Sequence, residues 1–395
     1  MSLFDSRLAD SNSLDLSIGA PGPDLLARAF DLFKEATNIS NSSSKEEFSL
    51  HFQYGPNEGS QVFLKALAEF LSGQYDCQVN AQSLILTCGA THGLHLAAST
   101  LLPRDGVVFV ENPTYFIALD IFRDLKLKVV SFERGNVHEL SQKVSEEKSR
   151  FAQTKQKFWG MIYTIPTFHN PTGLCLTEQE CKNMIDVAEE NDLLLICDDV
   201  YNLLWFSEEG KRLSKRLLAH KKSSNNVISN GSFSKVLAPG IRLGWIESSS
   251  CLIQDLKNTG VLSSGGAVNN VMSGLIAQVL MNGSLSKHIS FLRKEYGDRM
   301  DSVCTILAEK LPSGFLFDRP QGGYFIWIRG PAHLGFNAET FLNSNKGLRF
   351  LLGHKASSSS VDTFGNAFRV SIAYYDLATL VQAANLLCEG LKTYF

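Results

Sequence analysis

The sequence predicts an α/β fold in which helices cover a mostly parallel, seven-stranded sheet. The first observation is that short apolar runs alternate with stretches of helix length between residues 51 and 285. Parallel strands joined by crossover helices produce this alternation, because each crossover returns the chain to the same end of the sheet. The strands are expected at residues 83–88, 107–111, 128–132, 158–164, 193–197, 226–230 and 243–247. Helices are expected between them, for example at residues 91–102 and 177–191.

The second observation is that the pattern changes after residue 285. A long amphipathic helix over residues 284–311 is followed by short strands, and residues 376–394 have the pattern of a closing helix. The short strands are expected at residues 314–318, 324–329 and 368–374. This mixture indicates a smaller α+β unit after the sheet.

The third observation is the length of the chain. A chain of 395 residues is too long for one compact core, so two or three domains are expected. We expect a large domain over residues 51–285 and a small C-terminal α+β domain over residues 286–395, to which residues 1–50 contribute. The Ser- and Asn-rich residues 38–45 are expected to form an exposed loop.

Composition narrows the classes of partner. The formal net charge is −3, so the chain has no basic field to attract nucleic acid and no polybasic patch for a membrane surface. No apolar run reaches the length of a membrane span. We therefore expect small-molecule partners or a second copy of the chain, with neither nucleic acid nor membrane.

The cysteines indicate the compartment. The eight cysteines are scattered, and they form neither a CxxC pair nor a Cys/His cluster that would bind a metal. Several lie in apolar runs, where a buried thiol behaves as a small hydrophobic side chain. The N-terminus has the features of neither a secretion signal nor a transit peptide. These features predict reduced cysteines and a cytoplasmic location.

The residues that follow each predicted strand are the informative ones, because ligands of such sheets bind beyond the carboxyl ends of the strands. Residues 83–88 run into CGATHGL, where Gly89 permits a sharp turn. The amides of Ala90 and Thr91 then lie at a helix N-terminus, which favours a phosphate. An ordinary helix start would have the same sequence.

Two further residues follow strands. Tyr115, after residues 107–111, has a ring that can stack on a planar ligand, or it is an amphipathic residue at a domain edge. Asn170, in HNPTG, has a backbone restricted by Pro171, so its amide can be aimed into a cleft. The alternative for Asn170 is a local cap in a Pro-Gly turn.

Asp198, Asp199 and Tyr201 follow the strand at 193–197. Two carboxylates at the end of an apolar strand are costly to bury unless each has a partner. A protonated ring nitrogen is one such partner, because a buried carboxylate stabilises the cation. A solvated acid pair in a surface loop is the rival interpretation.

The strand at 226–230 is followed by Ser232, Ser234, Lys235 and Arg242. A lysine in a cleft shifts its pKa readily and can form an imine. The hydroxyls and the guanidinium would suit a phosphate. A solvated loop that carries two charges is the alternative.

Arg369 begins a strand-like run in the C-terminal region, where a guanidinium can bind a substrate carboxylate through two hydrogen bonds. A salt bridge on an edge strand is the alternative. Each feature is ambiguous alone. Together they provide a phosphate site, a stacking ring, an acid and an imine-forming lysine, the groups needed to hold a phosphorylated pyridine aldehyde.

Four motifs support a family assignment: FQYGPNEGSQ, HNPTG, DDVY and GSFSK with APGIRLGW, in that order along the chain. With them the sequence resembles the fold-type I pyridoxal-phosphate (PLP) aminotransferases of class I/II over almost its whole length. It looks most similar to the branch that holds aromatic, 2-aminoadipate and kynurenine aminotransferases and the aminotransferase-like domain of MocR regulators. The resemblance implies the PLP-dependent transferase fold and PLP as cofactor.

The resemblance implies catalytic roles for Lys235, Asp198 and Tyr201. Lys235 would form the Schiff base with PLP and shuttle the substrate proton. Asp198 would keep the pyridine nitrogen protonated, and Tyr201 would hydrogen-bond the ring hydroxyl together with Asn170. Tyr115 would stack on the ring. The residues implied to hold the phosphate are Ala90, Thr91, Ser232 and Arg242, with Ser234 as a possible addition.

The same resemblance implies the substrate contacts and the assembly. Arg369 would bind the α-carboxylate, and Asn170 and Gly19 would lie against the substrate. Tyr54 would reach the phosphate of the neighbouring subunit, so the active sites would be shared in a homodimer.

The function expected on this basis is transfer of an amino group between an L-amino acid, with 2-aminoadipate or aromatic donors favoured, and a 2-oxo acid. A PLP-dependent lyase or decarboxylase on the same scaffold and a non-catalytic PLP-binding regulator are the alternatives. No winged-helix region is recognised before the catalytic core, which argues against a complete MocR-type regulator. The sequence identifies no arginine that would bind a carboxylate on the substrate side chain, so it does not support specificity for dicarboxylates.

Overall fold

The computed structural model describes residues 13–42, 49–150, 157–220, 224–266, 268–358 and 363–394. Its largest sheet has seven strands in the order β2-β8-β7-β6-β5-β3-β4. The strands are β2 (Leu84–Thr87), β3 (Val107–Asn112), β4 (Lys128–Glu133), β5 (Gly160–Thr164), β6 (Leu193–Asp198), β7 (Val227–Ser232) and β8 (Gly244–Ser248). Only β8 runs antiparallel to its neighbours. The predicted fold class is confirmed, and each strand begins and ends within two residues of its predicted position.

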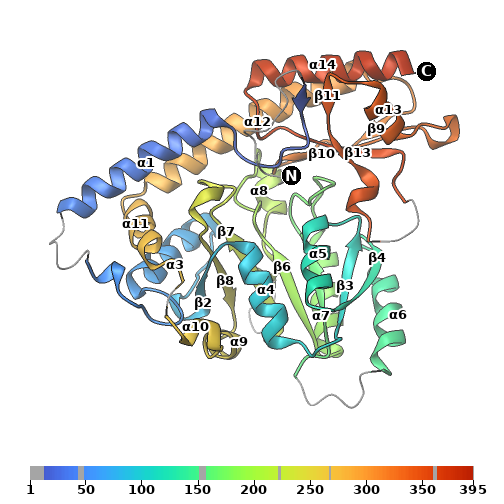
Figure 1. The fold of residues 1–395 in the computed structure, drawn as a ribbon. Helices are drawn as coiled ribbons and strands as arrows, with labels where there is room; N and C mark the ends of the chain where they lie inside the picture. Colours follow the sequence, from blue (N-terminus) through green and yellow to red (C-terminus); the bar gives the residue numbers. More distant parts are fainter. Residues whose placement is uncertain are drawn as a thin grey trace.

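Helices cover both faces of this sheet (Figure 1). Strand β3 shows the reason, because alternate residues point to opposite faces. Val108 and Val110 enter one apolar cluster, and Val107 and Phe109 enter the other. The helices before residue 284 are α1 (Pro23–Ser42), α3 (Gln61–Tyr75), α4 (Ala90–Leu101), α5 (Phe116–Asp124), α6 (Val137–Lys148), α7 (Glu178–Glu190), α8 (Glu208–Leu213), α9 (Ser250–Lys257), α10 (Gly260–Ser263) and α11 (Asn270–Met281).

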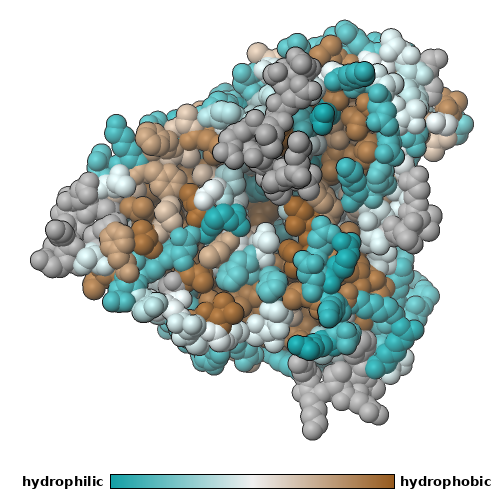
Figure 2. All heavy atoms as spheres, in the orientation of Figure 1, coloured by the Kyte–Doolittle hydropathy of each residue, from teal (hydrophilic) through white to brown (hydrophobic). Residues whose placement is uncertain are grey.

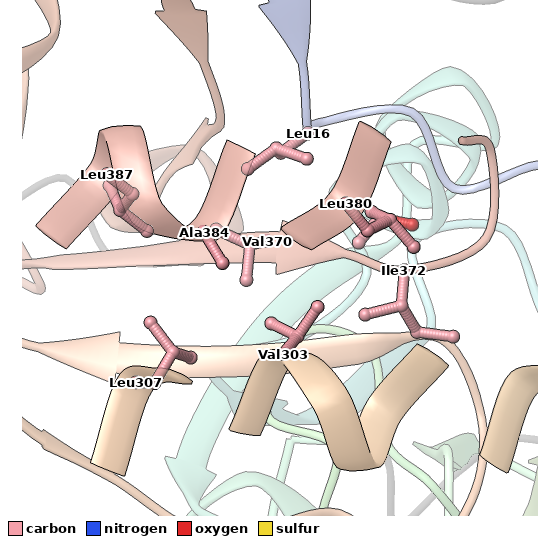
Figure 3. Close-up of a pocket in the computed structure, with 9 residues that line it drawn as sticks. Leu16, Val303, Leu307, Val370, Ile372, Leu380, Ala384 and Leu387 are labelled. Carbon is pink, nitrogen blue, oxygen red and sulfur yellow. The ribbon is translucent and has the colours of Figure 1, made fainter. Parts of the chain in front are cut away.

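The C-terminal part forms a second, antiparallel sheet in the order β12-β13-β10-β9. Its strands are β9 (Leu316–Phe317), β10 (Phe325–Arg329), β12 (Leu351–Leu352) and β13 (Ala367–Ser371). The accompanying helices are α12 (Ser284–Lys310), α13 (Ala338–Ser344) and α14 (Leu377–Tyr394). A cavity of about 10 Å³, lined by apolar side chains and Ser371, remains between α12, α14 and β13 (Figure 3). The predicted long helix, short strands and closing helix are all present.

The N-terminal segment joins this second sheet region rather than the first sheet. Strand β1 (Leu14–Asp15) pairs in parallel with β11 (Leu348–Arg349), and the Ser371 amide donates to the carbonyl oxygen of Leu16. The segment therefore passes close to β13 before α1 begins.

The prediction of a loop at residues 38–45 is wrong for residues 38–42, which continue α1, while residues 43–48 lie outside the described residues. The helix is established upstream, where Leu25, Ala29 and Ala36 are buried and α1 packs along α11. Once that packing forms, adding polar residues to the end of the helix costs little.

The two sheets meet at the carboxyl ends of the parallel strands (Figure 1). Figure 2 shows the molecular surface hollowed between the region that carries α14 and the region that carries the seven-stranded sheet. None of the helices within the described ranges is long and apolar enough to cross a membrane.

Candidate active site

Asp198, the last residue of β6, is buried at the carboxyl end of the seven-stranded sheet. The Tyr163 hydroxyl, from neighbouring β5, donates to its Oδ2 atom at 2.8 Å. Its Oδ1 atom is buried and has no hydrogen-bond partner among the described residues. Burial raises the pKa of Asp198 to about 6, against the opposing effects of the Tyr163 hydrogen bond and the Lys235 charge. A buried carboxylate with one open oxygen suits a cationic N–H group.

Lys235 lies just after β7 and reaches the N-terminal segment. Its Nζ atom donates a 2.6 Å hydrogen bond to the carbonyl oxygen of Gly19. Burial and the nearby Arg369 charge lower the pKa of Lys235 to about 8. The Tyr324 hydroxyl donates to the Lys235 carbonyl oxygen at 2.7 Å and so fixes the backbone. An amine with a lowered pKa is neutral more often, which is the form that acts as nucleophile and base.

Arg369, on β13, is almost fully buried and faces the same region. Its Nη1 atom donates to Asn170 Oδ1 at 2.7 Å, and its Nη2 atom donates to the Ser17 carbonyl oxygen at 2.6 Å. The guanidinium carbon lies 4.0 Å from the centre of the Phe325 ring. Its Nε atom is buried, and no described residue accepts a hydrogen bond from it. The alternative interpretation of Arg369 as part of an edge-strand salt bridge is wrong, because β13 lies between β10 and β12.

Asn170, Tyr201 and Tyr115 complete the wall of this region. The Asn170 amide acts on the Tyr201 hydroxyl and partly offsets the effect of burial on its pKa. Burial raises the pKa values of both Tyr115 and Tyr201, and the charges of Asp198 and Arg369 act on both hydroxyls. The structure thus brings together side chains from separate segments of the chain.

A second group of predicted residues surrounds the N-terminus of α4. Gly89 has a φ of +87°, and a Cβ atom added there would lie 3.1 Å from Arg242 Nη2. That guanidinium donates to the Cys88 carbonyl oxygen at 3.1 Å. Ala90 and Thr91 are the first residues of α4, so their amides have no acceptor within the helix. This geometry favours an anion at the turn.

Ser232 and Ser234 lie beside that turn. Their hydroxyls are 2.9 Å apart, and the Ser234 amide donates to Ser232 Oγ at 3.1 Å. Ser232 pairs with Gly244 on β8, and a Cβ atom at Gly244 would lie 2.8 Å from the Gly89 Cα atom. Glycine at position 244 therefore permits the close approach of β7, β8 and the turn before α4.

The interpretation of Asp198 and Asp199 as a solvated pair is wrong, because both carboxylates are buried. They also have different partners. The Ser229 hydroxyl donates to Asp199 Oδ2, and the Arg216 charge acts on Asp199, whereas Asp198 contacts Tyr163. Successive residues of an extended segment point to opposite sides, which separates the two acids.

Tyr54 is the predicted site residue that the structure does not bring to this group. Its side chain is 79% exposed in the connection before α3. Gly19, in contrast, lies against the group, since a Cβ atom there would meet the Phe325 ring at 2.8 Å and Arg369 Nη2 at 3.9 Å.

Sequence reasoning missed Tyr163, Tyr324 and Phe325. Tyr163 lies within an apolar run, where a buried tyrosine usually belongs to the core. In the structure Tyr163 pairs with Ile196 and therefore shares a sheet face with Asp198, two residues further along β6, and the sequence alone does not give this register.

Residues 11–387 match the family described as aminotransferase class I and II. An aromatic-amino-acid aminotransferase 1 from Thermococcus litoralis is 28% identical over 393 residues, which cover 97% of this chain and 88% of that protein.

Two solved structures are also similar. Kynurenine aminotransferase from Pyrococcus horikoshii is 27% identical with a TM-score of 0.83, covering 98% of this chain and 92% of that one. LysN, an alpha-aminoadipate aminotransferase from Thermus thermophilus, is 25% identical with a TM-score of 0.78, covering 97% and 93%. That structure is a complex with N-(5'-phosphopyridoxyl)-L-leucine.

Proposed function

The chain belongs to the class I and II aminotransferase family, whose cofactor is PLP, and on that premise we propose that Lys235 holds the cofactor covalently while an amino group passes between an L-amino acid and a 2-oxo acid. The observation that carries the proposal is the convergence of Lys235 Nζ, the open Oδ1 atom of Asp198 and the Arg369 guanidinium in one buried region. These three groups provide an attachment point, an anion for a ring cation and a carboxylate receptor.

The residues present fit PLP. Asp198 Oδ1 is a buried acceptor, open among the described residues, for the protonated ring nitrogen. The α4 N-terminus with Ser232, Ser234 and Arg242 offers donors for the phosphate. When bound, PLP supplies an electron sink for the electrons of the broken Cα–H bond. Asn170 and Tyr201 would bind the ring hydroxyl, and Tyr115 would cover the ring.

We assign the proton transfer at the substrate α-carbon to Lys235. With a pKa of about 8, roughly a tenth of the amine is neutral at pH 7, far more than for an ordinary lysine, and this neutral form can accept a proton. The Gly19 carbonyl oxygen restrains Nζ on the side of the N-terminal segment. A base held in a fixed direction needs less reorganisation when the proton moves.

Arg369 is proposed to bind the substrate α-carboxylate. Burial lowers its pKa to about 10, which still leaves it charged at neutral pH. Asn170 and the Ser17 carbonyl oxygen hold the guanidinium in place, and Phe325 supports its flat face. Gly19 has no side chain, which lets the backbone of the N-terminal segment lie against Phe325 and close to Arg369. This arrangement pre-orients the guanidinium for a planar anion.

For the amino donor we propose 2-aminoadipate or an aromatic amino acid. The similarity to proteins named as aromatic, kynurenine and alpha-aminoadipate aminotransferases supports this choice. A panel of amino acids with 2-oxoglutarate and pyruvate as acceptors tests it, and the donor with the highest kcat/KM should fall in one of these two groups.

We also propose a homodimer with shared active sites. Large apolar side chains are exposed on α1, α3, α10 and the connection at residues 50–54, and Figure 2 shows apolar surface over α1 and α11. The exposed residues are Phe30, Leu50, Phe52, Tyr54, Val62 and Val261. Burial of this surface against a second copy would remove it from water and bring Tyr54 to the partner's phosphate site.

Subunit complementation tests the shared site. Lys235→Ala and Tyr54→Ala variants should each be weakly active, and a refolded equal mixture should regain roughly a quarter of the wild-type activity, because half the dimers are mixed and each has one intact site. No gain on mixing, with dimers present, would show that Tyr54 serves its own subunit or none.

Two further assignments are proposals. The cysteines of the described residues are free thiols, which supports a cytoplasmic location. The change from the seven-stranded to the four-stranded sheet supports a domain division near residue 285, with the segment before residue 50 contributing to the smaller domain.

The reaction type is tested with the purified holoenzyme and an amino acid alone. A transaminase should release one equivalent of 2-oxo acid per active site and then stop, with pyridoxamine phosphate recovered after denaturation. Continuous release of ammonia or CO₂ would instead show lyase or decarboxylase chemistry and would overturn the proposal.

A further inference from the structure

The turn between β2 and α4 is held by side chains on several sides. The Thr87 hydroxyl donates to the Gly89 carbonyl oxygen at 3.1 Å, and Arg242 donates to the Cys88 carbonyl oxygen. The Cys88 amide donates to Nδ1 of His92 at 3.0 Å. The Cys88 backbone is therefore fixed at both its N–H and its C=O group. Of these partners, Thr87 and His92 have no role in the proposed function, and His92 is the one that accepts from the Cys88 amide.

The position of His92 in α4 explains its contact. Ala90 begins the helix, so His92 is its third residue, and Gly89 has no side chain with which to cap the amides. In a capping box a Glu or Gln at this third position accepts a hydrogen bond from a backbone amide just before the helix. The His92 ring has a comparable role, but its donor is the amide of Cys88, the residue before Gly89.

The imidazole differs from a carboxylate in charge. A glutamate at this position would place an anion within one helical turn of the Ala90 and Thr91 amides, where it would repel a phosphate. A neutral imidazole accepts the same hydrogen bond without that charge. Burial, and secondarily the nearby His95, lowers the pKa of His92, which favours the neutral ring.

We propose that His92 is a positioning residue for the phosphate-binding turn, which it fixes through a neutral acceptor so that the Ala90 and Thr91 amides face the phosphate. The proposal rests on the proposed function, because it assumes that this turn receives the phosphate of PLP. It predicts that His92 affects binding of the phosphorylated cofactor and leaves binding of the non-phosphorylated aldehyde unchanged.

The test compares PLP with pyridoxal, which lacks the phosphate. Full-length protein stripped of cofactor is titrated with each compound, and the dissociation constants are measured by absorbance and by quenching of tryptophan fluorescence. The variants are His92→Gln, His92→Leu and His92→Glu. His95→Leu is the matched control, because His95 is exposed on the same helix.

The variants should distinguish the effect of losing the hydrogen-bond acceptor from the effect of adding a negative charge. His92→Gln keeps a neutral acceptor and should bind PLP within about twofold of the wild type. His92→Leu should weaken PLP binding about tenfold, the effect of losing one hydrogen bond that orders a binding site. His92→Glu should weaken PLP binding by a similar factor through repulsion. Pyridoxal binding, and both constants of the control, should change less than about twofold.

Two results would overturn the proposal. Equal losses for PLP and pyridoxal in His92→Leu would show a general structural role, and an unchanged PLP constant in His92→Leu and His92→Glu would show no role. If His92→Leu does not fold, the Gln and Glu variants still decide between neutral acceptor and charge. Failure of the proposed function itself would look different, because the wild-type protein would then not distinguish PLP from pyridoxal.

Discussion

The Tyr163 hydroxyl donates to one oxygen of Asp198 at 2.8 Å, and the other oxygen of that carboxylate is buried without a partner among the described residues. Two adjacent parallel strands therefore orient a carboxylate by one oxygen and leave the second free for a ligand. Second-layer contacts of this kind fix the direction of a functional group and tune its basicity.

Tyr163→Phe should lower kcat about tenfold and change the KM of the amino donor little. The hydroxyl stabilises the charged form of Asp198, so its loss should raise the pKa of this carboxyl further above its ordinary value. Steady-state kinetics over a range of pH check both effects. Tyr375→Phe is the control for loss of a tyrosine hydroxyl, since the Tyr375 hydroxyl accepts from the Asp15 amide and contacts neither Asp198 nor Lys235. Equal kinetic effects in both variants would contradict a specific role for Tyr163.

Arg369→Lys should raise the KM of both the amino donor and the 2-oxo acid about 100-fold, with little change in PLP affinity. A lysine cannot reproduce the planar two-point contact of a guanidinium with a carboxylate. Arg329→Lys is the matched control, because Arg329 is an exposed arginine on the neighbouring strand β10. Unchanged KM values in Arg369→Lys would show that the substrate carboxylate binds at a different residue.

Asp199→Asn should change how the stability of the cofactor-free protein depends on pH. Burial raises the pKa of Asp199 from 3.8 to about 7. Between these values the unfolded chain releases the proton while the folded chain keeps it, so the Asp199 contribution to stability falls as pH rises from about 4 to 7. The variant lacks this loss, and its melting temperature relative to the wild type should rise over that window. A constant difference across the window would contradict the raised pKa.

Leu387→Ala should destabilise the protein by about 2–5 kcal/mol, because it enlarges the small cavity between α12, α14 and β13. Leu387 is buried, whereas its neighbour Leu386 is 38% exposed and serves as the matched control. Leu386→Ala should cost under about 1 kcal/mol. Denaturant unfolding measures both changes. Equal costs would show that the cavity region relaxes freely.

The fold could largely be predicted from the sequence because buried parallel strands are continuous apolar runs. Strands β3, β6 and β7 are bounded by polar or turn-forming residues, so their positions were clear. The two-residue strands β11 and β12 were not predicted. A pairing so short leaves no periodic pattern, and the partner strands decide whether it forms.

The candidate site was predictable to a smaller extent. Asp198, Lys235 and Arg242 stand out because charged residues are unusual at the ends of apolar strands. The hydrogen bond from Lys235 to Gly19 spans 216 residues of sequence, and no local signal indicates such a contact. The burial of Asp199 behind the site depends on Ser229 and Arg216, which also come from other segments.

The central claim is that Lys235 holds the cofactor covalently. Reduction of the holoenzyme with borohydride, followed by proteolysis and peptide mass spectrometry, tests it most directly. We expect the phosphopyridoxyl group on the peptide that contains Lys235 and its absence from a Lys235→Ala protein treated in the same way. A phosphopyridoxyl group on a different lysine, or none on the wild-type chain, would contradict it.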